Sequence, residues 1–158
     1  MTSIAATTQP EHAPGRQRPG GRLRALRGPA IAGAVTGILQ AASPLAFWWL
    51  EPKTVYALGI AVIAAIYIGF SVADGRGHVI AIETIVAALF VVVAAAGVTG
   101  SAWLLVLGLA GHGLKDLWQH RTHFVRNTRW WPPFCATVDF VAAGILAGAL
   151  LTGVSFHG

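Results

Sequence analysis

Charged side chains are scarce in this chain: they make up 11% of its 158 residues. A soluble domain carries about 25% charged residues, so this chain has too few to cover a surface that faces water. Hydrophobic residues make up 55% of the sequence, which also excludes a disordered chain. The composition therefore predicts an integral membrane protein and excludes a soluble globular enzyme.

Several motifs of common enzyme classes are also missing. Cys135 is the only cysteine, which excludes an intramolecular disulfide and a zinc site made of cysteines alone. The sequence contains no glycine-rich phosphate loop and no Ser-His-Asp order, so nucleotide-driven chemistry and serine hydrolysis are disfavoured. Any chemistry of this chain must come from other side chains.

Negative charge is scarcer than positive charge: 6 acidic residues stand against 11 basic ones, and the formal net charge is +5. A group of basic residues precedes the first apolar run: Arg16, Arg18, Arg22, Arg24 and Arg27. No aromatic residue interleaves them, so binding to nucleic acid is disfavoured. Their position is typical of a topology signal or of a contact with anionic lipid. We expect residues 1–28 to form a disordered basic tail.

Apolar segments fill the rest of the chain, and each is close to the ~20 residues that a helix needs to cross the hydrocarbon core. They lie near 30–50, 54–73, 79–98, 101–120 and 134–155. The first is longer than the ~7–15 residues of a signal-peptide core, which favours a retained helix over a cleaved signal. The sequence therefore predicts an all-α integral membrane protein, a bundle of about five transmembrane helices within residues 29–158.

Basic residues and tryptophans predict the orientation of these helices. With the N-terminus in the cytoplasm, every basic residue outside the spans except Lys53 lies on the cytoplasmic side. The tryptophans then gather at the two interfaces: Trp48, Trp49 and Trp103 outside, and Trp118, Trp130 and Trp131 inside. Both distributions follow the positive-inside and aromatic-belt rules. We expect a multi-pass protein of the cytoplasmic (inner) membrane with its C-terminus outside.

Ionisable side chains lie within the third, fourth and fifth segments. Placing such a side chain in a membrane span costs free energy, so each of them is expected to have a function. They are Glu83 in the third; His112, Asp116, His120 and His123 in the fourth; and, beside the thiol of Cys135, Asp139 in the fifth. Residues four apart share a helix face, so the set in the fourth segment forms one narrow stripe, as do the two residues in the fifth. In the predicted topology the whole set lies at similar depth, in the cytoplasmic half of the bilayer.

This constellation predicts a metal site. Neutral imidazole with carboxylate oxygens suits zinc, iron, copper or manganese, and two residues four apart on one helix can present two ligands. We expect a divalent transition metal held by His112, Asp116, His120, Asp139 and Glu83. Glu83 and Asp116 are also the candidate catalytic groups.

Three neighbouring side chains have simpler explanations. Cys135 is a lower-ranked ligand, because a single cysteine is by default a small buried apolar residue. His123 is ranked lower for another reason: it fits a solvated basic loop. Lys115 is expected to extend its ammonium group toward the lipid headgroups.

The stretch from about Glu51 to Ala143 resembles an uncharacterised family of small bacterial multi-span membrane proteins. The pattern of that family is an early acidic residue, a His-x3-Asp-x3-His helix, a Pro-Phe pair and a Cys-x3-Asp-Pro element. The matching residues here are Glu83; His112, Asp116 and His120; Pro133 and Phe134; and Cys135 and Asp139. Phe140 stands where the pattern has a proline. The resemblance implies no particular activity.

Three functions stay open for this constellation. A metal-dependent enzyme, either a hydrolase or an oxidase or oxygenase, would act on a lipid-soluble or amphiphilic substrate. A metal or proton carrier would need polar groups in both halves of the membrane, and the outer halves of the spans carry no charge at depth. An accessory subunit would use the stripe to bind a partner; Gly33-x3-Gly37 and Gly144-x3-Gly148 suit close packing in such a complex, in a homo-oligomer or within the chain. We favour the enzyme.

Overall fold

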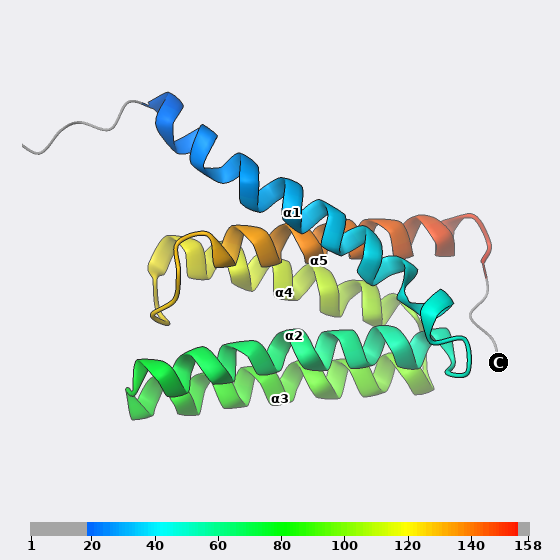
Figure 1. The fold of residues 1–158 in the computed structure, drawn as a ribbon. Coiled ribbons are helices and arrows are strands. Elements are labelled where there is room, and N and C mark those ends of the chain that lie inside the picture. The colour runs from blue at the N-terminus through cyan, green and yellow to red at the C-terminus, as the bar shows by residue number, and fades with distance from the viewer. Residues whose placement is uncertain (1–18, 155–158) are drawn as a thin grey trace, which may run out of the picture.

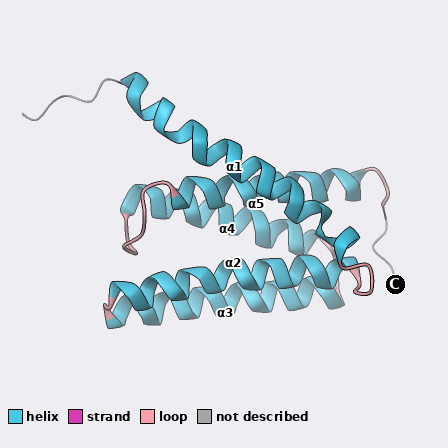
Figure 2. Ribbon diagram, viewed as in Figure 1, coloured by secondary structure: helices cyan, strands magenta, loops and turns pink. Residues whose placement is uncertain are grey.

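The computed structural model describes residues 19–154, and every regular element in that range is an α-helix. The helices are α1 (Pro19–Ala46), α2 (Pro52–Asp74), α3 (Gly77–Thr99), α4 (Trp103–Thr122) and α5 (Trp131–Leu151). Figure 2 shows that only short loops join them. The prediction of an all-α chain is therefore confirmed for the described residues.

Four of these helices are long and apolar enough to cross a membrane: α2, α3, α5 and the part of α1 from Leu26 to Ala46. The composition predicted such helices, although it placed five of them in the described part of the chain where four meet this criterion. The remaining helix, α4, is of similar length but carries polar residues from its middle onward, among them His112 and Asp116. The side chains of His112 and Asp116 point into the bundle, since both residues are buried.

Local sequence explains where the helices begin and end. Pro52 starts α2, where its missing N–H costs nothing because the first N–H groups of a helix have no partner. Gly75 ends the same helix in the left-handed conformation (φ 79°), with its N–H bonded to the Ser71 carbonyl over 3.1 Å. His123 ends α4 in the same way at φ 51°, a conformation that costs more for a residue with a side chain.

The first helix begins earlier than the sequence predicted. The expected tail extended to residue 28, but α1 starts at Pro19; residues 1–18 lie outside the described range. Proline is favoured in the first turn, and the arginines that follow it have high helix propensity, so a count of apolar residues alone misses this start. Pro29 and Pro44 lie inside α1, and each removes one backbone donor from the helix.

The helices pack chiefly as three neighbouring pairs: α1 with α5, α4 with α5, and α2 with α3. Figure 1 shows α1 crossing over α5, with α2 and α3 lying together on the opposite side. Gly33 and Gly37 allow the close approach of α1, because an added Cβ would lie 2.5 Å from the Phe134 carbonyl oxygen and 2.7 Å from that of Val138. One of the two predicted small-residue spacings therefore packs helices within the chain.

The loops gather at the two ends of the bundle (Figure 1). Loops 75–76 and 123–130 lie at one end, which we call the Asp74 end; loops 47–51 and 100–102 lie at the other, the Glu51 end. The core between α2, α4 and α5 toward the Glu51 end is apolar, with Ile60, Leu105, Leu109 and Leu146 almost fully buried.

An ion pair ties the loops of the Asp74 end together. Arg76 contacts the Asp74 carboxylate at 2.6 Å and donates from Nη2 to the Phe124 carbonyl over 2.6 Å. The backbone N–H of Arg126 donates to Asp74 Oδ2 over 2.8 Å. The hydrogen bonds that Arg76 donates to the Asp74 carboxylate also raise the pKa of its guanidinium. The segment after α4 is thereby fixed against the turn between α2 and α3.

Candidate metal centre

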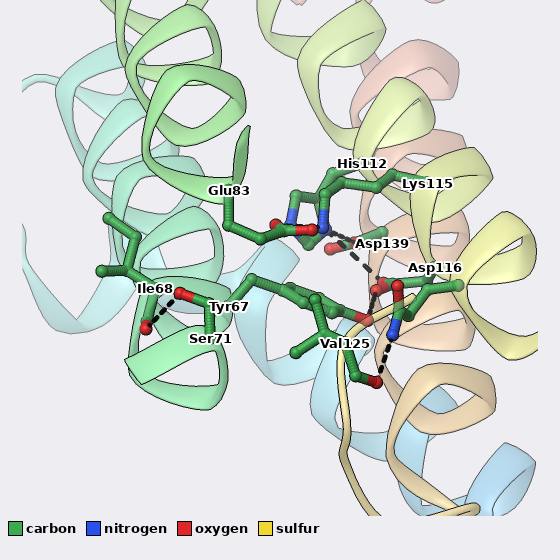
Figure 3. A network of polar contacts seen from close by, with 10 residues as sticks. Tyr67, Ile68, Ser71, Glu83, His112, Lys115, Asp116, Val125 and Asp139 are labelled. Carbon is green, nitrogen blue, oxygen red and sulfur yellow. Dashed lines mark hydrogen bonds and ion pairs between the residues drawn. The ribbon is translucent and has the colours of Figure 1, made fainter. Parts of the chain in front are cut away.

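Two buried carboxylates from different helices converge on one imidazole nitrogen. His112 Nδ1 on α4 donates to Asp139 Oδ2 on α5 over 2.8 Å. Asp116, one turn further along α4, brings its Oδ2 to 3.5 Å from the same nitrogen. Figure 3 shows the three side chains facing one another between the helices.

The same three residues meet the geometric requirement for a shared ion. One ligand atom from each of His112, Asp116 and Asp139 lies within 4.8 Å of the other two, and all three residues are buried. Ligands at ~2.0–2.2 Å from a zinc ion are separated from each other by roughly twice that distance or less, so small side-chain adjustments would complete a shell. This group could therefore hold a metal ion.

Each of the three residues also has one buried polar atom without a hydrogen-bond partner among residues 19–154: His112 Nε2, Asp116 Oδ2 and Asp139 Oδ1. A buried polar atom left unpaired costs about 1–3 kcal/mol, so such atoms are rare in native proteins and call for an explanation. A cluster of them in one place indicates a site that binds something.

Tyr67 on α2 orients one of the carboxylates. Its hydroxyl donates to Asp116 Oδ1, which leaves Oδ2 facing His112. The Tyr67 ring also packs edge-on against the His112 ring, with centroids 5.8 Å apart, and Phe90 packs against the same imidazole at 5.0 Å. The aromatic rings therefore fix the imidazole plane, while the hydroxyl fixes the carboxylate.

Glu83 lies close to this group but is already engaged. Its Oε2 forms an ion pair with Lys115 Nζ at 2.8 Å, and the ammonium also lies 3.4 Å from the centroid of the Tyr67 ring (Figure 3). The expectation that Lys115 extends to the headgroups differs from this arrangement, since only 12% of its side chain is exposed. The carboxylate of Glu83, expected as a metal ligand, attracts that ammonium into the bundle.

The other predicted ligands are not members of the group of three. His120 is half-buried and His123 is exposed beyond the end of α4; their rings lie 6.3 Å apart. Cys135 is buried one turn before Asp139 on α5 and is a free thiol. The stripe on α4 therefore faces the core at His112 and Asp116 but leaves it at the helix end.

Sequence reasoning did not include three buried polar contacts of this region. They come from Tyr67, Lys115 and Gln119, whose Nε2 donates to the Val125 carbonyl over 2.7 Å. Tyr67 carried a usable signal: a tyrosine in the middle of an apolar span, away from the interface, places a hydroxyl at depth. It precedes the turn at Asp74 by about as many residues as Glu83 follows it, so the two lie at similar depth.

The chain shows no match to a known protein family, to a curated protein or to a solved structure. The functional argument therefore depends on the geometry of the site.

Proposed function

We propose that this protein is a multi-pass membrane protein that binds one divalent transition-metal ion at His112, Asp116 and Asp139. We further propose that the ion serves an enzyme acting on a lipid-soluble or amphiphilic substrate. The observation that carries the proposal is the convergence of two buried carboxylates on one imidazole between α4 and α5.

The balance of charge among the buried side chains supports the binding of a cation. Glu83 and Lys115 neutralise each other, and within residues 19–154 the His112 imidazole is the basic group that contacts Asp116 and Asp139. Uncompensated negative charge is expensive within a membrane, so the pair of carboxylates needs protons or a metal ion. A divalent ion with neutral His112 would make the centre electrically neutral.

The types of donor atom limit which ions can bind at this site and which reactions they can support. One imidazole with two carboxylates suits zinc, iron, manganese or copper better than the all-oxygen shells of calcium and magnesium. Such an ion can activate water for hydrolysis or, if redox-active, support oxidation. Glu83 is the proposed general base, and it becomes available only when its bond to Lys115 opens.

The position of the buried polar residues favours an enzyme over a carrier. The fully buried charged residues of the described chain include none near the Glu51 end: Glu83, Asp116 and Asp139 lie on the Asp74 side of their helices, and His112 lies at the middle of α4. Asp139 lies ~12 Å along α5 from its first residue, well short of the far end. Transport by alternating access would require polar groups on both sides of a midplane site, and the core toward the Glu51 end is apolar.

The position of the exposed arginines supports a proposed orientation. The exposed arginines of the loop and helix end near the site, Arg121, Arg126 and Arg129, favour a cytoplasmic Asp74 end. We propose that α4 is the fifth transmembrane helix, because its polar side chains are covered by protein and not by lipid. The metal would then lie in the cytoplasmic half of the inner membrane.

Elemental analysis of detergent-purified protein tests the metal site. We expect about one zinc, iron, manganese or copper ion per chain, with loss of the ion in His112→Ala, Asp116→Asn and Asp139→Asn. His123→Ala is the matched histidine control, and it should retain the ion because that side chain is exposed. Folded wild-type protein that stays free of metal after incubation with each ion would contradict the proposal, and the three residues would then form a protonated hydrogen-bond network.

A further inference from the structure

The Lys115–Glu83 ion pair lies beside the metal centre without belonging to its ligand group. Lys115 precedes Asp116 on α4, and Glu83 comes from α3, with Nζ and Oε2 2.8 Å apart. Their side chains are 12% and 2% exposed. Tyr67 connects the pair to the centre, because one face of its ring contacts the ammonium, its hydroxyl binds Asp116 and its edge meets His112.

Stability alone does not account for an ion pair in this place. The loss of hydration on burying two charges offsets most of their attraction, and well-packed apolar residues usually serve as well. Charged groups at depth in a membrane are therefore expected to have a function. Tyr67 contacts both the ammonium and Asp116, and Lys115 precedes Asp116 directly in the chain, so the two charges lie near the place where an ion would bind.

We propose that Lys115 and Glu83 determine which cation charge the centre accepts, and that the intact pair selects a divalent ion. This inference rests on the proposed function, because it requires an ion at His112, Asp116 and Asp139. With the pair intact, the centre presents two uncompensated negative charges. Without the ammonium it presents three, and without the Glu83 carboxylate it presents one. Removing the ammonium should therefore favour a trivalent ion over a divalent one, and removing the carboxylate should do the opposite.

Equilibrium dialysis of purified protein against Mn²⁺ and Gd³⁺ measures this selection. In Lys115→Gln we expect the ratio of Gd³⁺ to Mn²⁺ affinity to rise about tenfold or more, and in Glu83→Gln to fall about tenfold, where tenfold corresponds to about 1.4 kcal/mol. The same two ions are compared in every variant, so the effect of ionic size cancels. Lys53→Gln is the matched control, because Lys53 lies at the Glu51 end, where its Nζ donates to the Gly100 carbonyl over 3.4 Å.

Two further variants separate charge from structure. The double variant Lys115→Gln with Glu83→Gln removes both charges, and the exchange Lys115→Glu with Glu83→Lys keeps the total charge. We expect both to retain an affinity ratio within about threefold of the wild-type value, even though the original ion pair is gone. The melting midpoint of each variant shows that it is folded, and the neutral double variant avoids leaving one buried charge alone.

The outcomes distinguish this inference from the proposed function. An unchanged affinity ratio in both single variants, or a double variant that shifts as far as a single one, would overturn the selection by charge while leaving the metal site in place. Wild-type protein that binds neither Mn²⁺ nor Gd³⁺ would overturn the selection by charge, and if it also binds no zinc, iron or copper, the proposed function is overturned as well.

Discussion

The Tyr67 hydroxyl decides which oxygen of Asp116 faces the imidazole. It occupies Oδ1 from α2, a helix that contributes no other group to the centre, and Oδ2 is thereby directed at His112. Groups that orient a ligand in this way commonly change metal affinity by about 10–100-fold when removed. For the metal ion proposed at this site, we therefore expect Tyr67 to position a ligand and not to be one.

Tyr67→Phe tests that role, because it removes the hydroxyl and keeps the ring that packs on His112 and under Lys115. We expect metal affinity to fall about tenfold. The free energy of unfolding of the metal-free protein should fall by about 1–2 kcal/mol, since one buried hydrogen bond to a carboxylate is lost. Equilibrium dialysis and denaturant unfolding measure the two effects separately. A loss of stability with unchanged metal affinity would show that the hydroxyl has only a structural role.

The sequence predicted His112, Asp116 and Asp139 as site residues because two simple rules bring them together. Residues four apart share a helix face, and antiparallel neighbouring helices place their ends at the same depth. Those rules cannot give the direction of a long side chain. Lys115 was expected to reach the headgroups, but the Glu83 carboxylate lies within 2.8 Å of its ammonium inside the bundle. The partner of a lysine depends on which helices are neighbours, and that information is tertiary.

At the scale of helices, glycine spacing has different consequences on α1 and α5. Gly33 and Gly37 face α5 so closely that a Cβ would meet backbone oxygens at 2.5 and 2.7 Å. Gly144 and Gly148 on α5 have the same spacing, but nothing described lies within 4 Å of a Cβ at either. The pattern in the sequence is identical, so only the packing of the chain separates the two pairs.

This difference allows the packing of α1 on α5 to be tested with two matched substitutions. Gly37→Leu should lower the free energy of unfolding by about 3 kcal/mol or more, because the new side chain has to displace the backbone of α5. Gly148→Leu should change the same quantity by less than about 0.5 kcal/mol, as expected for an exposed position. Thermal unfolding in detergent compares the two variants with the wild type. Equal destabilisation by both would contradict the packing of α1 on α5, and a change of oligomeric state in Gly148→Leu alone would identify a contact between chains.

Helix boundaries were predictable where the sequence has a strong breaker and not elsewhere. Pro52 and Gly75 stand at the two ends of α2 within two residues of the predicted span. The start of α1 was missed because a proline followed by arginines has no apolar period, although it is compatible with helix. Apolar periodicity detects the part of a helix that contacts lipid or core, and α1 begins before that part.

For the whole molecule, the alternation of five helices brings the two polar loops, 75–76 and 123–130, to the same end. The Asp74 end carries exposed arginines, whereas the Glu51 end carries Lys53 as its only basic residue among the described positions. A protein inserted by the positive-inside rule would place the Asp74 end in the cytoplasm. The sequence predicted this orientation, and it stays a prediction.

Accessibility labelling of single cysteines in a Cys135→Ser background tests the orientation. Cysteine at Thr128 in the loop after α4 should react only after the membrane is permeabilised, and cysteine at Glu51 should react in intact cells. The reason is that the loop arginines hold the Asp74 end on the cytoplasmic side. The reverse pattern would move the metal centre to the outer half of the bilayer, and labelling of both positions from outside would contradict the number of spans between them.

The central claim is that one imidazole and two carboxylates bind a metal ion inside the bundle. X-ray absorption at the edge of the metal found in purified protein tests it most directly, because the spectrum reports ligand type and distance together. The structure predicts a nitrogen and oxygen shell at about 2.0–2.2 Å with one imidazole contribution that disappears in His112→Ala, and no sulfur. A sulfur shell near ~2.3 Å would assign Cys135 as a ligand, and a spectrum unchanged by His112→Ala would place the ion elsewhere; either result would contradict the account.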